Sequence, residues 1–270
     1  MSSLLKQYMK VNFFRHKLEN AVGALTATTP IRETNPEDVF IIGYPKSGHT
    51  WFQNLVSGVV YGVDPARTPD TVIQELVPDV GFRRFYRRLS TPMFFKSHEL
   101  PKPEYKRVVY LLRDGRDAIV SYFHFTRNLT GKNVDFADFV RSTSTWWEHV
   151  ETWLTNPYQA QIITIRYEDL LADPARELAR FCEFAGIESE ADVLKSVAER
   201  ATFSNMRNKE VTQGWSNKKW PKDKHFVRRG IAGSYKDEMP PEVLELFMQG
   251  ARATLSKCGY ARANDRQQGV

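Results

Sequence analysis

The segment from Gly43 to Trp51, with the sequence GYPKSGHTW, constrains the fold more than any other part of the chain. It follows an apolar run at 39–42 that has the length of a buried strand. After it, Trp51, Leu55 and Val59 recur every four residues, as on one face of a helix. A strand, a glycine turn and a helix N-terminus in this order form an anion site, because the first N–H groups of the helix and the positive end of its dipole face the ligand. The segment therefore predicts an α/β fold with an anion-binding loop.

The lysine of this loop is displaced from its usual place. Gly43 and Gly48 keep the spacing of the GxxxxGK[ST] loop of nucleotide hydrolases, but His49 stands in the lysine position and Lys46 lies inside the turn. A nucleotide kinase or NTPase is the alternative function, and it would need a lysine at position 49 and a downstream acid for Mg²⁺. The displacement favours a different anionic ligand.

Further apolar runs of strand length follow at 93–96, 108–112 and 162–165. Helical patterns or long crossovers separate them, which favours a parallel sheet covered by helices on both faces. The expected fold is a three-layer, P-loop-like α/β domain with a central parallel sheet flanked by helices.

Other segments carry weaker patterns. A helical segment is expected at 1–30, and the apolar spacing from Phe136 to Leu154 predicts a buried helix stripe. Residues 207–229 are dense in Lys and Arg and have no apolar period, so we expect a long irregular lid loop there.

The formal net charge of +6 and the pI near 9.2 indicate an anionic partner. Nucleic acid competes for that role, since residues 82–88 interleave aromatic side chains with arginines, but no nucleic-acid module accompanies them and we expect no nucleic-acid partner. No apolar run reaches the ~18 residues of a membrane span and no secretory signal pattern opens the chain, so we expect a soluble, cytoplasmic protein without a transmembrane segment.

Five segments, taken in order, resemble the cytosolic-type sulfotransferases, which use 3′-phosphoadenosine 5′-phosphosulfate (PAPS) as donor. They are YPKSGHTW at 44–51, FKSH at 95–98, RDGRDAIVSY at 113–122, RYEDL at 166–170 and RRGIAG at 228–233. The resemblance implies one sulfotransferase domain over 1–270. It also implies transfer of the sulfuryl group to a hydroxyl of a small, aromatic or lipophilic acceptor, release of 3′-phosphoadenosine 5′-phosphate (PAP), and no metal.

Three residues are expected to carry the chemistry. In-line sulfuryl transfer leaves charge on the bridging oxygen of the donor, and Lys46 and Lys96 are the cations placed to stabilise it. His98, at the end of the same strand as Lys96, is the expected general base, which is the role that the resemblance gives to the histidine of the KxH pattern.

The resemblance also implies a donor site. The phosphosulfate loop comprises Lys46, Ser47, Gly48, His49 and Thr50. The 3′-phosphate contacts are Arg113, Ser121, Arg228, Arg229 and Gly230. The adenine contacts are Trp51, Tyr167, Phe203 and Met206. His49 replaces the usual Thr of the family and Arg229 its usual Lys.

The acceptor pocket is expected around His98. Its candidate lining residues are Phe82, Phe85, Tyr86, Phe125 and His149. A carbohydrate sulfotransferase is a second alternative, although such enzymes more usually have a membrane anchor and a glutamate base. The short dimerisation signature of the family is not visible after Lys236, so we predict no oligomeric state.

Overall fold

The computed structural model describes residues 26–143, 145–217 and 219–260. Its main sheet is parallel throughout, with the strand order β4-β2-β5-β6. These strands are β2 (Val39–Ile42), β4 (Phe94–Ser97), β5 (Arg107–Leu112) and β6 (Gln161–Arg166). A second, two-stranded sheet pairs β1 (Thr29–Pro30) with β3 (Phe85–Tyr86).

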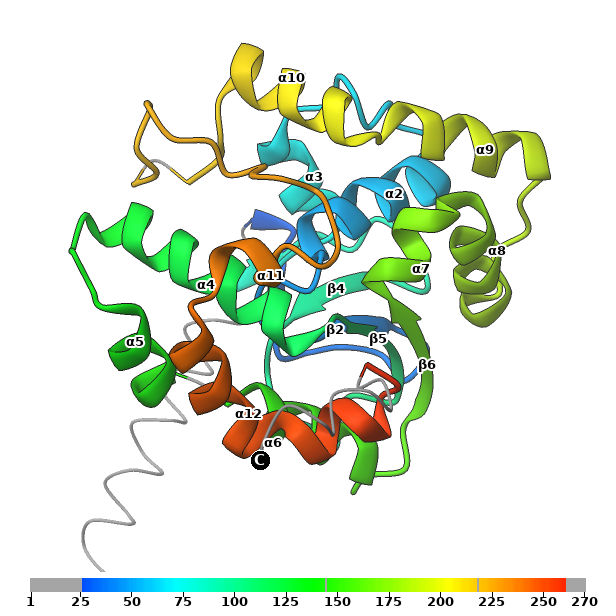
Figure 1. Cartoon of the computed structure of the whole chain (residues 1–270). Coiled ribbons are helices and arrows are strands. Elements are labelled where there is room, and N and C mark those ends of the chain that lie inside the picture. The colour runs from blue at the N-terminus through cyan, green and yellow to red at the C-terminus, as the bar shows by residue number, and fades with distance from the viewer. Residues whose placement is uncertain (1–25, 144, 218, 261–270) are drawn as a thin grey trace, which may run out of the picture.

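Helices cover both faces of the main sheet (Figure 1). One layer contains α2 (His49–Tyr61), α7 (Tyr167–Ala172), α8 (Pro174–Ala185) and α9 (Ala191–Arg200). The other contains α4 (Gly115–Thr130), α5 (Phe136–Thr143), α6 (Trp146–Thr155) and α12 (Pro241–Lys257). Three shorter or peripheral helices are α3 (Asp70–Leu76), α10 (Phe203–Gln213) and α11 (Tyr235–Glu238).

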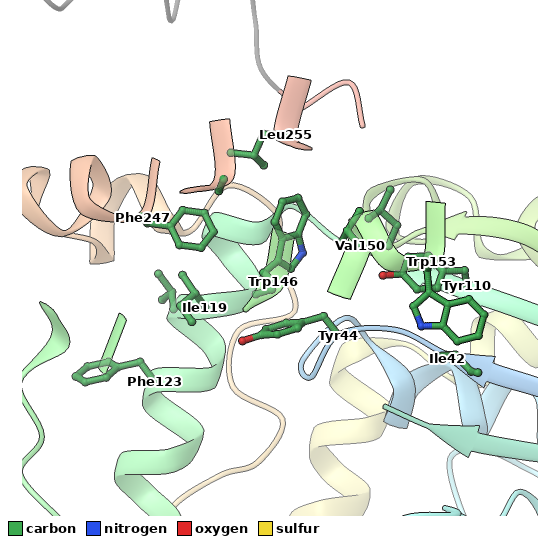
Figure 2. Close-up of a cluster of buried hydrophobic side chains, with 14 of the residues drawn as sticks. Ile42, Tyr44, Tyr110, Ile119, Phe123, Trp146, Val150, Trp153, Phe247 and Leu255 are labelled. Atoms are coloured by element: carbon green, nitrogen blue, oxygen red, sulfur yellow. The ribbon is translucent and has the colours of Figure 1, made fainter. Parts of the chain in front are cut away.

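Side chains alternate between the two faces of the sheet along each strand, so the protein has two apolar cores, one on each face. Val39 and Ile41 of β2 pack with the α2 layer, whereas Phe40 and Ile42 pack with the α4 layer, because successive side chains of a strand point to opposite faces. Figure 2 shows the second core, in which fully buried Trp146 lies with side chains of α4 and α12. The predicted α/β class with a flanked parallel sheet is confirmed.

The sequence predicted one helix with a buried stripe from Phe136 to Leu154, but the structure has two helices there. α5 ends at Thr143 and α6 begins at Trp146. The hydroxyls of Ser142 and Thr143 donate to carbonyl oxygens of the preceding turn. Such side-chain bonds to the backbone compete with helix continuation, so the apolar spacing is retained while the helix is interrupted.

The expectation of an irregular loop over 207–229 was wrong for residues 207–213, which belong to α10. The helix begins after Thr202, whose side chain accepts from Asn205 N, and ends at Gly214, which has φ 76°. Lys209 and Glu210 of α10 are buried and hydrogen-bonded, so polar contacts stabilise this helix in place of an apolar stripe. The expected N-terminal helix lies almost wholly outside the described residues.

The parallel sheet gathers the sequence motifs at one edge. The loop at 43–48 follows β2, His98 follows β4, Arg113 follows β5 and Tyr167 follows β6. The carboxyl ends of parallel strands lie at the same edge, which is where ligands bind in open α/β sheets.

Among the described helices, none is long and apolar enough to cross a membrane.

Asp38 fixes the start of the central strand. Its carboxylate is fully buried and accepts from Met93 N at 2.8 Å, from Asn35 N at 2.7 Å, and from both terminal nitrogens of Arg88 at 2.9 and 2.7 Å. It therefore joins β2 to the residue before β4 and holds a partly exposed guanidinium against the sheet.

We expect Asp38→Ala to lower the free energy of unfolding by about 3–5 kcal/mol, because breaking one side of a buried ion pair leaves its partner uncompensated. Denaturant unfolding followed by circular dichroism measures this. Glu37→Ala, at the exposed neighbouring position, is the matched control and should change stability by less than about 0.5 kcal/mol. A similar small effect for both variants would contradict the role of Asp38.

Candidate active site

A cavity of about 360 Å³ opens at the carboxyl edge of the sheet. All of the residues predicted to bind the donor line it except Ser47, and Lys96 and His98 line it as well. Ser47 is buried, and its Oγ has no hydrogen-bond partner within the described part of the chain. The structure therefore brings segments from six separate parts of the sequence to one site.

The loop has the backbone of an anion site. Gly48 precedes α2 with φ 100°, and a Cβ there would lie 2.8 Å from the ring of Tyr167, so this position needs glycine. No side chain among the described residues caps α2, which leaves its first N–H groups for a ligand.

Lys46 is a lysine of the cavity wall. Its Nζ lies 4.1 Å from the ring centre of Phe226 and 4.5 Å from that of Phe125. Burial of the ammonium lowers its pKa to about 7, and the neighbouring charges of Lys96 and Arg113 act in the same direction. A buried anion beside Lys46 would reverse this effect, because opposite charge favours the ammonium form.

Arg113 connects the loop to the segment at 228–233. It donates to Lys46 O at 3.0 Å and to Ile231 O at 3.2 Å, and its guanidinium lies over the ring of Tyr167 at 4.2 Å. Its Nε is buried without a partner among the described residues. This donor is therefore left for a ligand.

His98 has the tautomer of a base. Its Nδ1 lies 2.9 Å from Gly43 O, and because a carbonyl oxygen can only accept, Nδ1 carries the proton and Nε2 keeps a lone pair. Burial, followed by the charge of Lys96, lowers its pKa to about 4, while the bond to Gly43 and the charge of Asp79 oppose this shift. The imidazole is thus neutral over the ordinary pH range.

His49 packs beside His98 with ring centroids 4.2 Å apart. It is 4% exposed, and neither ring nitrogen has a partner among the residues that the structure describes. Burial, followed by the charge of His98, holds its pKa well below the ordinary value. His49 therefore offers a neutral, unsatisfied imidazole to whatever occupies the cavity.

The arginines at 228 and 229 share one carboxylate. Glu238 pairs with Arg228, and it pairs with Arg229 Nη1 at 3.0 Å and with His124 Nε2 at 3.0 Å. Arg228 lines the cavity, and its buried Nε has no partner within the described ranges. Both arginines thus have a fixed position while one donor stays available.

The backbone after these arginines is anchored by Asp117. This fully buried carboxylate accepts from Gly233 N at 2.6 Å and from Tyr235 N at 2.9 Å. Gly230 has φ 64°, and a Cβ on it would lie 2.2 Å from the ring of Phe203. The glycine at this position therefore lets the chain pass against an aromatic ring of the cavity wall.

The segment after α10 packs over Lys46. Phe226 stacks on Trp215 with centroids 4.1 Å apart, and Trp220 stacks on Phe125 of α4 at 5.4 Å. Glu210 accepts from the backbone N–H of Phe226 and of Val227. Aromatic contacts and one buried carboxylate thus hold this segment across the cavity.

Two of the five candidate acceptor residues, Phe82 and Phe125, line the cavity. Phe85 and Tyr86 lie outside it, because they form β3 and Tyr86 packs on Phe95 at 4.9 Å. His149 also lies outside it: Nε2–H donates to His98 O at 3.2 Å and Nδ1 accepts from Tyr110 at 2.9 Å. The bond from His149 to the carbonyl oxygen of His98 supports the backbone of His98.

Sequence patterns missed several residues of the site. Phe226 and Glu210 lie in a stretch without an apolar period, so nothing marked them. Asp117 lies inside the 113–122 segment, but the sequence gives no sign that it holds the chain after Arg229. Asp79 follows Pro78 as a single acidic residue with no accompanying motif.

Comparison with known proteins shows the family of this chain. The chain matches the sulfotransferase domain family over residues 36–259 and belongs to that family. Sulfotransferase 1E1 of Mus musculus is 24% identical over 253 residues, which cover 83% of this chain and 85% of that protein. Flavonol 3-sulfotransferase of Flaveria bidentis is 27% identical over 251 residues, which cover 79% and 80%. The predicted class, a PAPS-dependent sulfotransferase, is confirmed.

Solved structures share the fold. A retinol dehydratase in complex with androsterone and the inactive cofactor PAP has a TM-score of 0.66 and 21% identity, covering 86% of this chain and 84% of that chain. Mouse sulfotransferase SULT7A1 complexed with PAP has a TM-score of 0.62 and 20% identity, covering 84% and 88%. At these identities the likeness establishes the common architecture.

We expect PAP binding at about pH 8 to take up close to one proton. In the free protein, Lys46 with a pKa of about 7 is mostly neutral at this pH, and a bound phosphate raises that pKa, so the lysine becomes protonated. Calorimetry in two buffers of different ionisation enthalpy gives the proton count.

Lys46→Arg is the matched variant, because its guanidinium is charged before binding. It should bind PAP with almost no proton uptake. Equal uptake by the wild type and this variant would show that Lys46 is not the group that titrates.

Proposed function

We propose that this enzyme transfers the sulfuryl group of PAPS, in line, to a hydroxyl of a small acceptor, with His98 as general base. One observation carries the proposal: cationic side chains from separate elements converge on one cavity that also holds a neutral histidine with a free Nε2. The cations are Lys46, Lys96, Arg113, Arg228 and Arg229.

The residues fit a donor with two separate anionic groups. A nucleotide of this kind carries about four negative charges near neutral pH. Among the described residues, Ser47 Oγ in the loop and the Nε atoms of Arg113 and Arg228 in the cavity wall are buried donors without a partner. Loop N–H groups, Lys46, Ser47 and Thr50 would hold the phosphosulfate, and Arg113, Ser121, Arg228 and Arg229 the 3′-phosphate.

The aromatic wall suits a purine. Trp51 is fixed by a 2.7 Å bond from Nε1 to Ala201 O and lies edge-on to Tyr167. Phe203 and Met206 of α10 line the same cavity. We propose that these residues contact the adenine ring. The PAP complexes of retinol dehydratase and the mouse sulfotransferase support a PAP-type nucleotide for this chain.

The chemistry divides between the lysines and the histidine. The donor supplies a sulfuryl group bonded through an oxygen to its 5′-phosphate, and this oxygen keeps the bonding electrons. Lys46 and Lys96 stabilise the negative charge there, an effect typically worth ~2.7–4 kcal/mol for each preorganised donor. His98 Nε2 removes the proton of the acceptor hydroxyl, and the bond from Nδ1 to Gly43 O holds the ring in place.

The acceptor side supports an aromatic or lipophilic molecule. Phe82 lines the cavity although it is 86% exposed, and Tyr122 and Phe125 add apolar surface on the α4 side. Hydrophobic and aromatic side chains are the typical lining of small-molecule sites. The retinol dehydratase complex with androsterone is consistent with a lipophilic acceptor.

We also propose that the segment from 214 to 229 is a lid. It carries Phe226 over Lys46 and leads directly into Arg228, so a ligand held by Lys46 and Arg228 would fix the C-terminal end of the segment. Its aromatic contacts with α4 provide the surface on which it closes.

The alternatives lack comparable support. A kinase or NTPase would need a lysine at position 49, and the structure places unsatisfied His49 there. A carbohydrate sulfotransferase would more usually have a glutamate as base, whereas His98 is the group with a free lone pair at the cavity.

The test is transfer of radiolabelled sulfate from PAPS, in the presence of EDTA, to a panel of phenols, sterols, long-chain alcohols and sugars. We expect transfer to at least one phenol or lipophilic alcohol. His98→Ala should lower kcat by ~10²–10⁴-fold, because proton removal is lost, and should leave the Kd of PAP within about twofold.

Arg127→Ala, on the last turn of α4 and outside the cavity lining, is the control and should transfer at close to the wild-type rate. If His98→Ala kept more than about a tenth of the wild-type kcat, His98 would not be the base. Transfer to sugars alone would favour the carbohydrate class.

A further inference from the structure

Residues 78–80 lie beside β4 and pair with it through one isolated bridge. Lys96 N donates to Pro78 O and Val80 N donates to Lys96 O, both at 2.9 Å, which makes a parallel bridge between Asp79 and Lys96. Backbone register therefore places Asp79 directly beside Lys96, at the sheet edge that carries the active site.

The two side chains form a nearly buried ion pair. Asp79 is 4% exposed, and its Oδ2 lies 2.9 Å from Lys96 Nζ. Its Oδ1 accepts from Gly81 N at 2.9 Å. A buried ion pair contributes little net stability compared with apolar residues of similar size. Its position at the wall of the cavity therefore points to a role in the reaction.

Proton transfer adds a positive charge at this place. His98 lies two residues after Lys96. Burial, followed by the charges of Lys96 and His149, lowers the pKa of His98, while the Gly43 carbonyl and Asp79 raise it. His49, packed against His98, is neutral and supplies no counter-charge. When His98 becomes an imidazolium, it adds a second positive charge near the ammonium of Lys96. Asp79 is the carboxylate that offsets these two positive charges.

We propose that Asp79 is a positioning residue for sulfuryl transfer, which fixes Lys96 beside His98 and balances the charge that His98 gains with the acceptor's proton. In this step the acceptor O–H bond breaks and its proton moves to Nε2. The acceptor oxygen bonds to sulfur, and the bridging oxygen leaves with its electron pair on PAP. The inference rests on the proposed function, because it takes His98 as the base.

The first test is Asp79→Asn in the full-length protein. Asparagine keeps an oxygen for Gly81 N, and it removes the negative charge and the second oxygen that faces Lys96 Nζ. We expect kcat to fall at least tenfold, about the effect of one pKa unit in the base, with the Kd of PAP within about twofold. Glu75→Gln is the control. Glu75, on neighbouring α3, forms an exposed ion pair with Arg83, and loss of this pair should leave kcat unchanged.

The second test is the pH titration of the His98 ring by NMR, which needs no turnover. Asp79→Asn should move the onset of protonation to lower pH, because it removes the negative charge. Lys96→Met should move it to higher pH, because it removes the positive charge. General structural damage would not give shifts of opposite sign.

A double-mutant cycle completes the design. If Asp79 acts partly by fixing Lys96, Asp79→Asn should lower kcat by a clearly smaller factor in a Lys96→Met background than in the wild type, because only the balancing of the His98 charge is then left to lose. An unchanged His98 titration in Asp79→Asn, or an equal loss of kcat in both backgrounds, would overturn the proposal. Opposite titration shifts in a protein that transfers nothing from PAPS would instead overturn the proposed function.

Discussion

The structure depends on concentrating positive charge at one edge of a parallel sheet. Burial and the repulsion of neighbouring cations bring the pKa of Lys46 down to about 7, which shows that the free site is electrostatically unfavourable for its own lysine. A multiply charged anion removes this repulsion and satisfies buried N–H donors at the same time. In the proposed function, binding of the donor and organisation of the catalytic groups therefore have one physical cause.

The sheet supplies the geometry that this charge cluster needs. The loop at 43–48, His98, Arg113 and Tyr167 each follow a strand, so hydrogen-bonded register fixes their spacing. Carboxylates then hold the cations in orientation. Asp79 pairs with Lys96, and Glu238 pairs with the arginines of the 228–233 segment. The site thus combines rigid strand ends with cations whose side chains are individually held.

The sequence predicted the parts of the site that follow strands, because a glycine loop and a KxH pattern at a strand end have local signatures. It could not predict contacts made between distant segments. Asp79 is a single acidic residue in the sequence, and only the backbone bridge places it beside Lys96, which lines the cavity. Apolar spacing likewise predicted one helix at 136–154, since the interruption comes from hydroxyl bonds to the backbone. The helical start of the 207–229 segment carried no apolar period because polar contacts stabilise it.

The central claim is that the cationic site recognises the 3′-phosphate of a bisphosphorylated adenosine without a metal. Calorimetric titration of the full-length protein with PAP and with adenosine 5′-phosphate, both in EDTA, tests it most directly. Charge-assisted hydrogen bonds from Arg113 and Arg228 to the extra phosphate should make PAP bind at least tenfold more tightly, which is about 1.4 kcal/mol. Equal affinities for the two nucleotides would contradict the account.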